Sequence, residues 1–119
     1  MKKICVITGS RAEFGLLQGV LNGLKTAPDV HLQVIVTGAH LVSGHGKTYQ
    51  EIRAAGFEID AEVDMLLASD SPRAVGQSLG LGVIGITNAL SRLSPDLIVL
   101  LGDRYEALAA AQSAMVLRI

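Results

Sequence analysis

The sequence predicts an α/β protein in which a parallel sheet is covered by helices on both faces. Short apolar, β-branched runs that stop at a glycine recur along the chain, and the stretches between them show the three- and four-residue apolar spacing of amphipathic helices. Inner strands of parallel sheets are buried on both faces and therefore consist of such continuous apolar runs. With 119 residues, 50% of them hydrophobic and 18% charged, the chain fits one domain with one core.

The first two strands are predicted at residues 4–8 and 32–37, and a glycine follows each of them. The single cysteine, Cys5, lies within the first apolar run, so we interpret it as a buried strand residue and exclude an internal disulfide. Between these strands, apolar residues at helical spacing predict a helix over residues 12–25. Residues 39–47 contain two glycines and are predicted to form a loop.

The next part of the chain predicts a short helix, an edge strand and a long helix. Residues 48–55 suit the short helix. Apolar and acidic residues alternate over residues 57–63, which predicts a strand with one wet face at the edge of the sheet. Ser71 is a favoured N-cap and Pro72 a favoured first helical residue, so the long helix is expected to begin there and to end near residue 93.

The last strand and helix are predicted at residues 97–101 and 104–117. The strand is wholly apolar, which predicts burial on both faces. Right-handed crossovers then place the carboxyl ends of all strands on one side of the sheet. The last helix carries no charge over residues 107–117, and a crossover helix normally returns to a further strand. We therefore expect residues 1–119 to form one incomplete domain of a longer protein.

Composition and charge exclude several classes of partner. A formal net charge of −1 with 3% aromatic residues lacks the basic surface and the stacking groups of a nucleic-acid binder. Residues 74–91 are uncharged, but their glycines and polar side chains make a poor lipid-facing surface, and packing against a sheet or a partner subunit explains them better. The apolar run behind Lys2 and Lys3 is too short for an export signal. We expect a cytoplasmic protein without membrane or nucleic-acid partners.

Polar residues follow a glycine at three of the four predicted strand ends. They are Arg11 with Glu13, His40, and Asp103 with Arg104. Ligands of open α/β sheets bind in the crevice beyond the carboxyl ends of the strands, and each glycine is expected to leave room for a ligand there. The helix that begins near Arg11 directs its amides at this crevice, which suits a phosphate, and Arg11 adds a forked cation. The alternative is that Arg11 pairs with Glu13 and caps the helix.

Asp103 and His40 are the candidates for chemistry and for sugar binding. Asp103 follows an apolar strand and a glycine, where partial desolvation makes a role in proton transfer feasible. The alternative for Asp103 is the N-cap of the helix that begins at Arg104. His40 is a plausible contact for a sugar or a phosphate.

No cofactor is expected. Residues 9–15 lack the G-x-G-x-x-G pattern, and the second strand ends without the acidic residue that holds a dinucleotide ribose, which disfavours NAD. Residues 46–48 resemble the end of a P-loop, but the first glycine of that motif is missing and the strand lies too far upstream. The histidines lack partners at the spacing of metal ligands.

Four motifs together resemble one enzyme family. They are VITGSRAEFGLL at residues 6–17, VTGAHL at 36–41, GKTY at 46–49 and LGDRYE at 101–106. In this order they resemble the hydrolysing UDP-N-acetylglucosamine 2-epimerases, especially the branch that makes N-acetylmannosamine for sialic-acid-type sugars. The resemblance runs along essentially all 119 residues.

The resemblance implies a fold, a reaction and residue roles. It implies two Rossmann-like domains in the GT-B arrangement, of which this chain is most of the first, so the C-terminal UDP-binding domain is absent from it. The implied reaction needs no cofactor and converts UDP-N-acetylglucosamine and water to N-acetylmannosamine and UDP, through elimination of UDP and hydration with inversion at C2. Arg11 resembles the phosphate-proximal arginine of the family, Asp103 its first catalytic acid and His40 a loop histidine near the sugar. We expect Glu13 and Arg104 to bind substrate beside them.

The sequence departs from the family pattern at two positions, and it also fits two other functions. Some relatives carry a lysine where this chain has Leu16, and many carry a histidine at Leu101; both departures fit the sialic-acid branch. The alternatives are the acceptor domain of a GT-B glycosyltransferase and a non-catalytic module for sugar-nucleotide binding or dimerisation. The glycine-rich helix over residues 74–93 could form a dimer face, so a homo-oligomer is expected, and the isolated chain is expected to be inactive.

Overall fold

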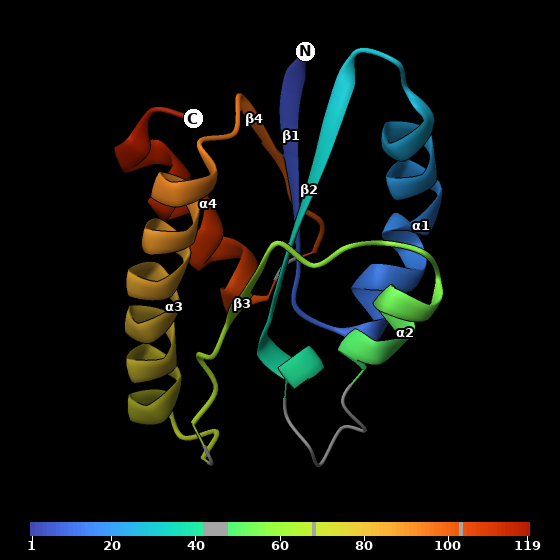
Figure 1. Cartoon of the computed structure of the whole chain (residues 1–119). Coiled ribbons are helices and arrows are strands. Elements are labelled where there is room, and N and C mark those ends of the chain that lie inside the picture. Colours follow the sequence, from blue (N-terminus) through green and yellow to red (C-terminus); the bar gives the residue numbers. More distant parts are fainter. Residues whose placement is uncertain (42–47, 68, 103) are drawn as a thin grey trace.

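The computed structural model describes residues 1–41, 48–67, 69–102 and 104–119, which form four strands and alternating helices (Figure 1). In chain order the elements are β1 (Lys2–Thr8), α1 (Arg11–Thr26), β2 (Val30–Thr37), the 3₁₀ helix η1 (Gly38–Leu41), α2 (Tyr49–Ala54), β3 (Ala61–Val63), α3 (Pro72–Leu93), β4 (Leu97–Val99) and α4 (Tyr105–Leu117). All strand pairs are parallel, in the order β3-β2-β1-β4. The predicted fold class is therefore confirmed.

The register brings the ends of the central strands together. Lys2 pairs with Val30 and Thr8 with Val36, so β1 and β2 run side by side over the whole length of β1. Because the strands are parallel, the segments that follow β1, β2 and β4 leave the sheet on the same side. We call this side the carboxyl end of the sheet and the opposite side its amino end.

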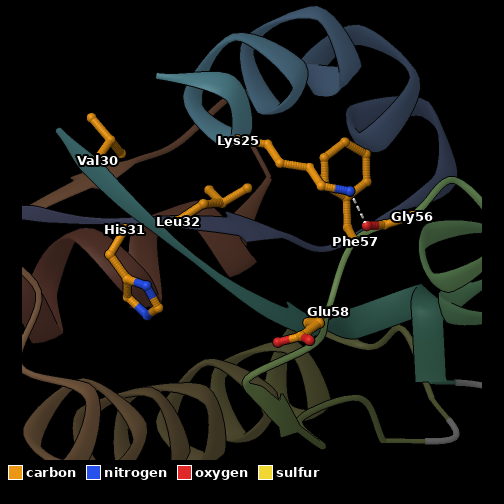
Figure 2. Close-up of a pocket in the computed structure, with 7 residues that line it drawn as sticks. All are labelled: Lys25, Val30, His31, Leu32, Gly56, Phe57 and Glu58. Atoms are coloured by element: carbon orange, nitrogen blue, oxygen red, sulfur yellow. Dashed lines mark hydrogen bonds between the residues drawn. The ribbon is translucent and has the colours of Figure 1, made fainter. Parts of the chain in front are cut away.

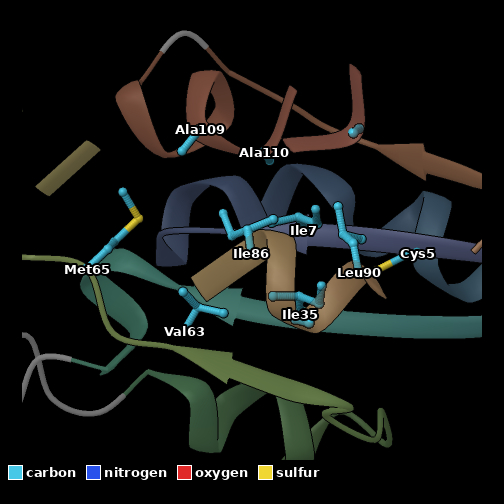
Figure 3. Packing of buried hydrophobic residues seen from close by; sticks show 11 residues of the cluster. Cys5, Ile7, Ile35, Val63, Met65, Ile86, Leu90, Ala109 and Ala110 are labelled. Carbon is cyan, nitrogen blue, oxygen red and sulfur yellow. The ribbon is translucent and has the colours of Figure 1, made fainter. Parts of the chain in front are cut away.

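The pleat of the strands divides the core into two layers, one on each face of the sheet. Cys5 and Ile7 of β1 point toward α3 and α4, whereas Val6 points toward α1 and α2. Figure 3 shows the first layer, in which Ile86 and Leu90 of α3 lie over the strands and two alanines of α4 lie near them. Cys5 is fully buried within β1, which confirms its predicted role as a buried strand residue. This burial raises the pKa of its thiol to about 12.

Helix α3 begins and packs as the sequence predicts. Ser71 is its N-cap and accepts a hydrogen bond from the Ala74 amide, with Pro72 in the first turn. A Cβ atom on Gly82 would lie 2.5 Å from the Met65 methyl group, and one on Gly85 would lie 2.5 Å from a Val63 methyl group. These two glycines therefore let α3 approach the β3 region closely.

None of the helices in the described part of the chain has the length and hydropathy that a membrane-spanning segment requires.

The third strand lies at the sheet edge as predicted, but it is shorter than the alternating pattern suggests. Regular strand pairing with β2 begins only at Ala61, because the preceding residue contacts β2 through its side chain as well as its backbone. The Asp60 carboxylate accepts a hydrogen bond from the Val34 amide at 2.7 Å, and the Asp60 amide donates one to the Val34 carbonyl. Of the three acidic residues in this segment, Glu58 and Glu62 are exposed, as expected for a wet face, and Asp60 is partly buried.

The prediction that the fourth strand is buried on both faces is wrong. β4 pairs with β1 alone among the described strands and therefore forms the other edge of the sheet. Leu97 is 53% exposed, and Ile98 and Val99 are only partly buried. The strand is also shorter than predicted, since it ends at Val99 rather than at residue 101.

Candidate functional site at the carboxyl end of the sheet

Two glycines at the carboxyl end, Gly9 and Gly38, make room for the buried side chain of Glu106. A Cβ atom on Gly9 would lie 3.2 Å from Glu106 Cβ, and one on Gly38 would lie 3.1 Å from Glu106 Cγ. Gly38 and Gly102 also have positive φ angles of 61° and 97°, which favour glycine. The expectation that these glycines leave open space for a ligand is thus wrong for Gly9 and Gly38, because Glu106 occupies the space at both and the Gly9 carbonyl oxygen also closes it at Gly38.

Glu106, in the first turn of α4, forms a two-point ion pair with Arg104. Glu106 is 2% exposed, and its Oε2 and Oε1 accept from Arg104 Nε at 2.8 Å and Nη2 at 3.2 Å. The carboxylate raises the pKa of the half-exposed Arg104 guanidinium by hydrogen bonding and by its charge. Sequence reasoning missed Glu106 as a site residue, although it is the only acidic residue in an otherwise uncharged helix.

Glu13 lies beside this pair in the first turn of α1. Ser10 caps the helix by accepting from the Glu13 amide, and Glu13 Oε2 accepts from the Gly9 amide at 3.4 Å. Glu13 is 8% exposed, and its Oε1 has no hydrogen-bond partner in the described part of the chain. Burial raises the pKa of this carboxyl and the Glu106 charge adds to the shift, against the Gly9 hydrogen bond and Arg104. The neutral acid is therefore favoured more than in an exposed glutamate.

His40 joins two segments beneath the carboxyl end. Its ring is fully buried, with Nε2 at 3.0 Å from the Thr8 hydroxyl and Nδ1 at 2.7 Å from the Thr48 hydroxyl. Burial lowers the pKa of His40 to about 4, with the Ser10 backbone opposing this shift, so the ring is neutral near pH 7. Both ring nitrogens thus bond to protein groups from the end of β1 and the start of α2.

Of the remaining predicted site residues, one is exposed near the carboxyl end of the sheet and one lies outside the described residues. Arg11 forms an exposed ion pair with Glu51 of α2 at 3.2 Å, so the alternative that it pairs with Glu13 and caps the helix is wrong. Asp103 lies outside the described residues. The N-cap position of α4 falls at Arg104. The structure therefore brings Glu13, Glu106 and Arg104 together, with His40 beneath them.

A cavity at the amino end of the sheet offers a contrasting environment (Figure 2). It has a volume of about 320 Å³ and is lined by residues that include Lys25, His31 and Glu58, all of them exposed. Lys25 donates to the Gly56 carbonyl, and its ammonium lies 5.3 Å from the centroid of the Phe57 ring. These contacts fasten a turn against α1. Within the described ranges, no group of three or more metal-ligating side chains could hold an ion.

Sequence comparison assigns the chain to a family. A sequence model described as UDP-N-acetylglucosamine 2-epimerase matches residues 22–119. The chain belongs to this epimerase family. It is 37% identical over 118 residues to the GDP/UDP-N,N'-diacetylbacillosamine 2-epimerase (hydrolyzing) of Campylobacter jejuni, covering 99% of this chain and 30% of that protein. It is 38% identical over its whole length to the UDP-N,N'-diacetylbacillosamine 2-epimerase (hydrolyzing) of Legionella pneumophila, covering 32% of that protein.

Solved structures of epimerases in this family share the fold. The Neisseria meningitidis UDP-GlcNAc 2-epimerase bound to UDP-GlcNAc superposes with a TM-score of 0.78 at 20% identity, over 100% of this chain and 30% of that one. The Methanocaldococcus jannaschii enzyme in complex with UDP-GlcNAc and UDP gives a TM-score of 0.80 at 24% identity, over 98% of this chain and 30% of that one. The chain spans about 30% of the length of the curated relatives it matches. The predicted family and the predicted Rossmann-like part of a GT-B-type fold are confirmed.

Proposed function

We propose that this chain forms one wall of the active site in a hydrolysing UDP-sugar 2-epimerase. Membership of the family and the relatives named as hydrolysing epimerases support this proposal. The observation that carries it is the buried acidic cluster at the carboxyl end of the sheet, where Glu13 and Glu106 meet the Arg104 guanidinium. Buried acids with perturbed pKa values and a fixed cation gather at functional sites, and this end of the sheet is where parallel α/β folds bind ligands.

The substrate that we propose is a UDP-linked 2-acetamido sugar, with UDP-N-acetylglucosamine and the sialic-acid-type route as the first candidate. The names of the two diacetylbacillosamine relatives make UDP-N,N'-diacetylbacillosamine the competing substrate. Arg11 and Arg104 both present exposed guanidinium surface beside the carboxyl end, which suits the diphosphate. Glu13 is a further candidate for substrate binding. The fully buried His40 supports the site indirectly, through its hydrogen-bond contacts with the Thr8 and Thr48 hydroxyls.

The proposed reaction is a hydrolysis with inversion at C2. In the first step a base removes the C2 proton, the electrons of the C2–H bond form the C1–C2 double bond, and the C1–O bond to UDP breaks. Water then adds its hydroxyl to C1 and a proton returns to C2 from the other face, which gives the free 2-epimer and UDP. Asp103 is our candidate for proton transfer or positioning around C2, because a carboxylate in a closed cleft can serve as such a base.

Product analysis with the complete gene product tests this function. Either UDP-sugar is incubated with the enzyme in D₂O, and the products are identified by NMR spectroscopy. We expect UDP, the free 2-epimerised sugar and deuterium at C2. Transfer of the unchanged sugar to an acceptor would instead identify a glycosyltransferase, and binding without turnover would identify a binding module. Residues 1–119 alone are expected to show no turnover.

We also propose that the protein self-associates through α3 and α4. Ile84 of α3 and Met115 and Val116 of α4 expose between 63% and 71% of their surface. Helices α3 and α4 pack against each other, and large exposed apolar side chains on neighbouring helices suit an interaction surface. Sedimentation of the complete gene product should reveal a dimer or larger species, and Met115→Glu should shift it toward the monomer. A parent protein that stays monomeric at high concentration would contradict this proposal.

A further inference from the structure

Glu106 is the most deeply buried charged group at the carboxyl end, and a single cation neutralises it among the described residues. Its aliphatic part fills the space above Gly9 and Gly38, and its carboxylate is almost inaccessible to solvent. A carboxylate in such a place is stable only when it is paired and hydrogen-bonded. Arg104 supplies both hydrogen bonds, through Nε and Nη2.

The two-point contact fixes the plane of the Arg104 guanidinium. Arg104 is the N-cap residue of α4, where the helix dipole disfavours a cation. Glu106 therefore holds the guanidinium at a position that it would otherwise avoid. An arginine has five N–H donors. Glu106 accepts from two of its nitrogens, while half of the Arg104 side-chain surface stays exposed at the carboxyl end.

We infer that Glu106 is a positioning residue that holds the Arg104 guanidinium ready to bind the diphosphate of the UDP-sugar. The inference rests on the proposed function and deepens it, because it assigns a role to a residue that does not itself reach the substrate. Glu106 then contributes to affinity only through Arg104. A forked guanidinium held in one plane matches phosphate oxygens at two points, and a freely rotating one does not.

Equilibrium binding of UDP to the complete gene product tests this role. Glu106→Gln keeps the shape of the side chain but removes the charge that fixes Arg104. We expect it to weaken UDP binding by about tenfold, the scale of one charge-assisted hydrogen bond, while kcat changes by less than about threefold. The opposite result, tighter UDP binding on loss of a negative charge, would show that Glu106 acts only as a repelling charge and would overturn the inference.

A double-mutant cycle separates positioning from general damage to the fold. Arg104→Gln should weaken UDP binding at least as much as Glu106→Gln, and the double variant should bind UDP no more weakly than Arg104→Gln alone. Additive losses would show that Glu106 acts independently of Arg104 and would overturn the inference. Arg104→Gln leaves a buried carboxylate without its cation and can fail to fold for that reason. The double variant removes both charges of the pair, so its UDP binding can still be measured and compared with that of Glu106→Gln.

The control is an ion pair of the same type at the sheet edge. Glu62 of β3 pairs with Arg53 at 3.2 Å, and both side chains are exposed. Glu62→Gln should leave UDP binding and kcat unchanged. If the parent enzyme turns over UDP-sugar but Glu106→Gln binds UDP normally, the inference fails and the proposed function stands. If the parent neither binds UDP nor turns over UDP-sugar, the proposed function itself fails.

Discussion

The two ends of the sheet carry charged residues in opposite environments. At the amino end, Lys25, His31 and Glu58 surround a cavity but remain exposed, and Lys25 serves to fasten a turn. At the carboxyl end, Glu13 and Glu106 are almost fully buried and connected to neighbouring groups by hydrogen bonds. The amino end thus has an open cavity lined by ordinary surface residues, whereas the carboxyl end has polar groups held where charge is unfavourable.

We therefore use the burial of polar groups, rather than the presence of a cavity, to choose the proposed functional end of the sheet. Removing a charge from water is unfavourable unless partners compensate for it. The carboxyl end supplies such partners from the segments that follow β1 and β4, while the amino end needs none. Variants at matched positions of the two ends therefore test whether substrate binding and catalysis depend on the carboxyl end alone.

The largest effect is expected for Asp103, which the sequence places at the carboxyl end. Asp103→Asn keeps the shape of the side chain but removes the base, so kcat of the complete gene product should fall by roughly 10²-fold or more while UDP still binds. Steady-state kinetics and UDP titration measure the two quantities. Glu58→Gln at the amino end is the matched control and should leave kcat unchanged. An unchanged kcat with lower thermal stability would make Asp103 a structural residue.

The second effect concerns His40 and acid stability. The folded protein lowers the pKa of His40 from 6.5 to about 4, so the unfolded chain binds more protons between these values and stability falls as the pH is lowered through that window. Below pH 4, where His40 is protonated in both the folded and the unfolded protein, the free energy of unfolding is lower than at neutral pH by about 3 kcal/mol.

Urea unfolding between pH 4 and pH 7 measures this dependence. His40→Gln should remove most of the slope, because glutamine does not titrate. His31→Gln at the amino end replaces an exposed histidine and should keep the slope of the parent. A parent-like slope in His40→Gln would show that other groups cause the acid sensitivity.

The smallest effect is expected for Glu13. Its pKa is raised in the folded protein, so the stability that the neutral acid contributes is present below the ordinary pKa and is lost as the pH rises through the raised value. Glu13→Gln should therefore lose less stability than the parent as the pH rises from 4 to 8. Glu51→Gln, in the exposed first turn of α2, serves as the control. Equal slopes in Glu13→Gln and the parent would contradict a favoured neutral acid.

The local parts of this architecture are predictable from the sequence. The apolar runs and their glycine stops predict the strands, and Ser71 with Pro72 predicts the start of α3 because a helix cap is a local hydrogen-bonding pattern. The short β3 was not predictable, since the Asp60 carboxylate replaces a regular strand contact across the sheet. The position of β4 at an edge also depends on strand order, which an apolar run alone does not reveal.

The candidate site was only partly predictable for the same reason. Arg11, Glu13, His40 and Arg104 stand directly behind strand ends, so their place at the carboxyl end follows from the parallel sheet. The burial of Glu106 follows instead from tertiary packing against Gly9 and Gly38, and in sequence it resembles any acidic residue in the first turn of a helix. Likewise, the partner of Arg11 comes from α2 and not from its own helix.

Mapping of amide chemical shifts during titration with UDP tests most directly which end of the sheet binds the substrate. In the complete gene product, we expect shifts in the amides of Gly9, Glu13, Gly38 and Glu106 at the carboxyl end. The amides of His31, Gly56 and Glu58 at the amino end should stay unchanged at the same UDP concentrations. Shifts confined to the amino end would contradict a substrate site at the carboxyl end, because the substrate would then bind where the charged groups are exposed.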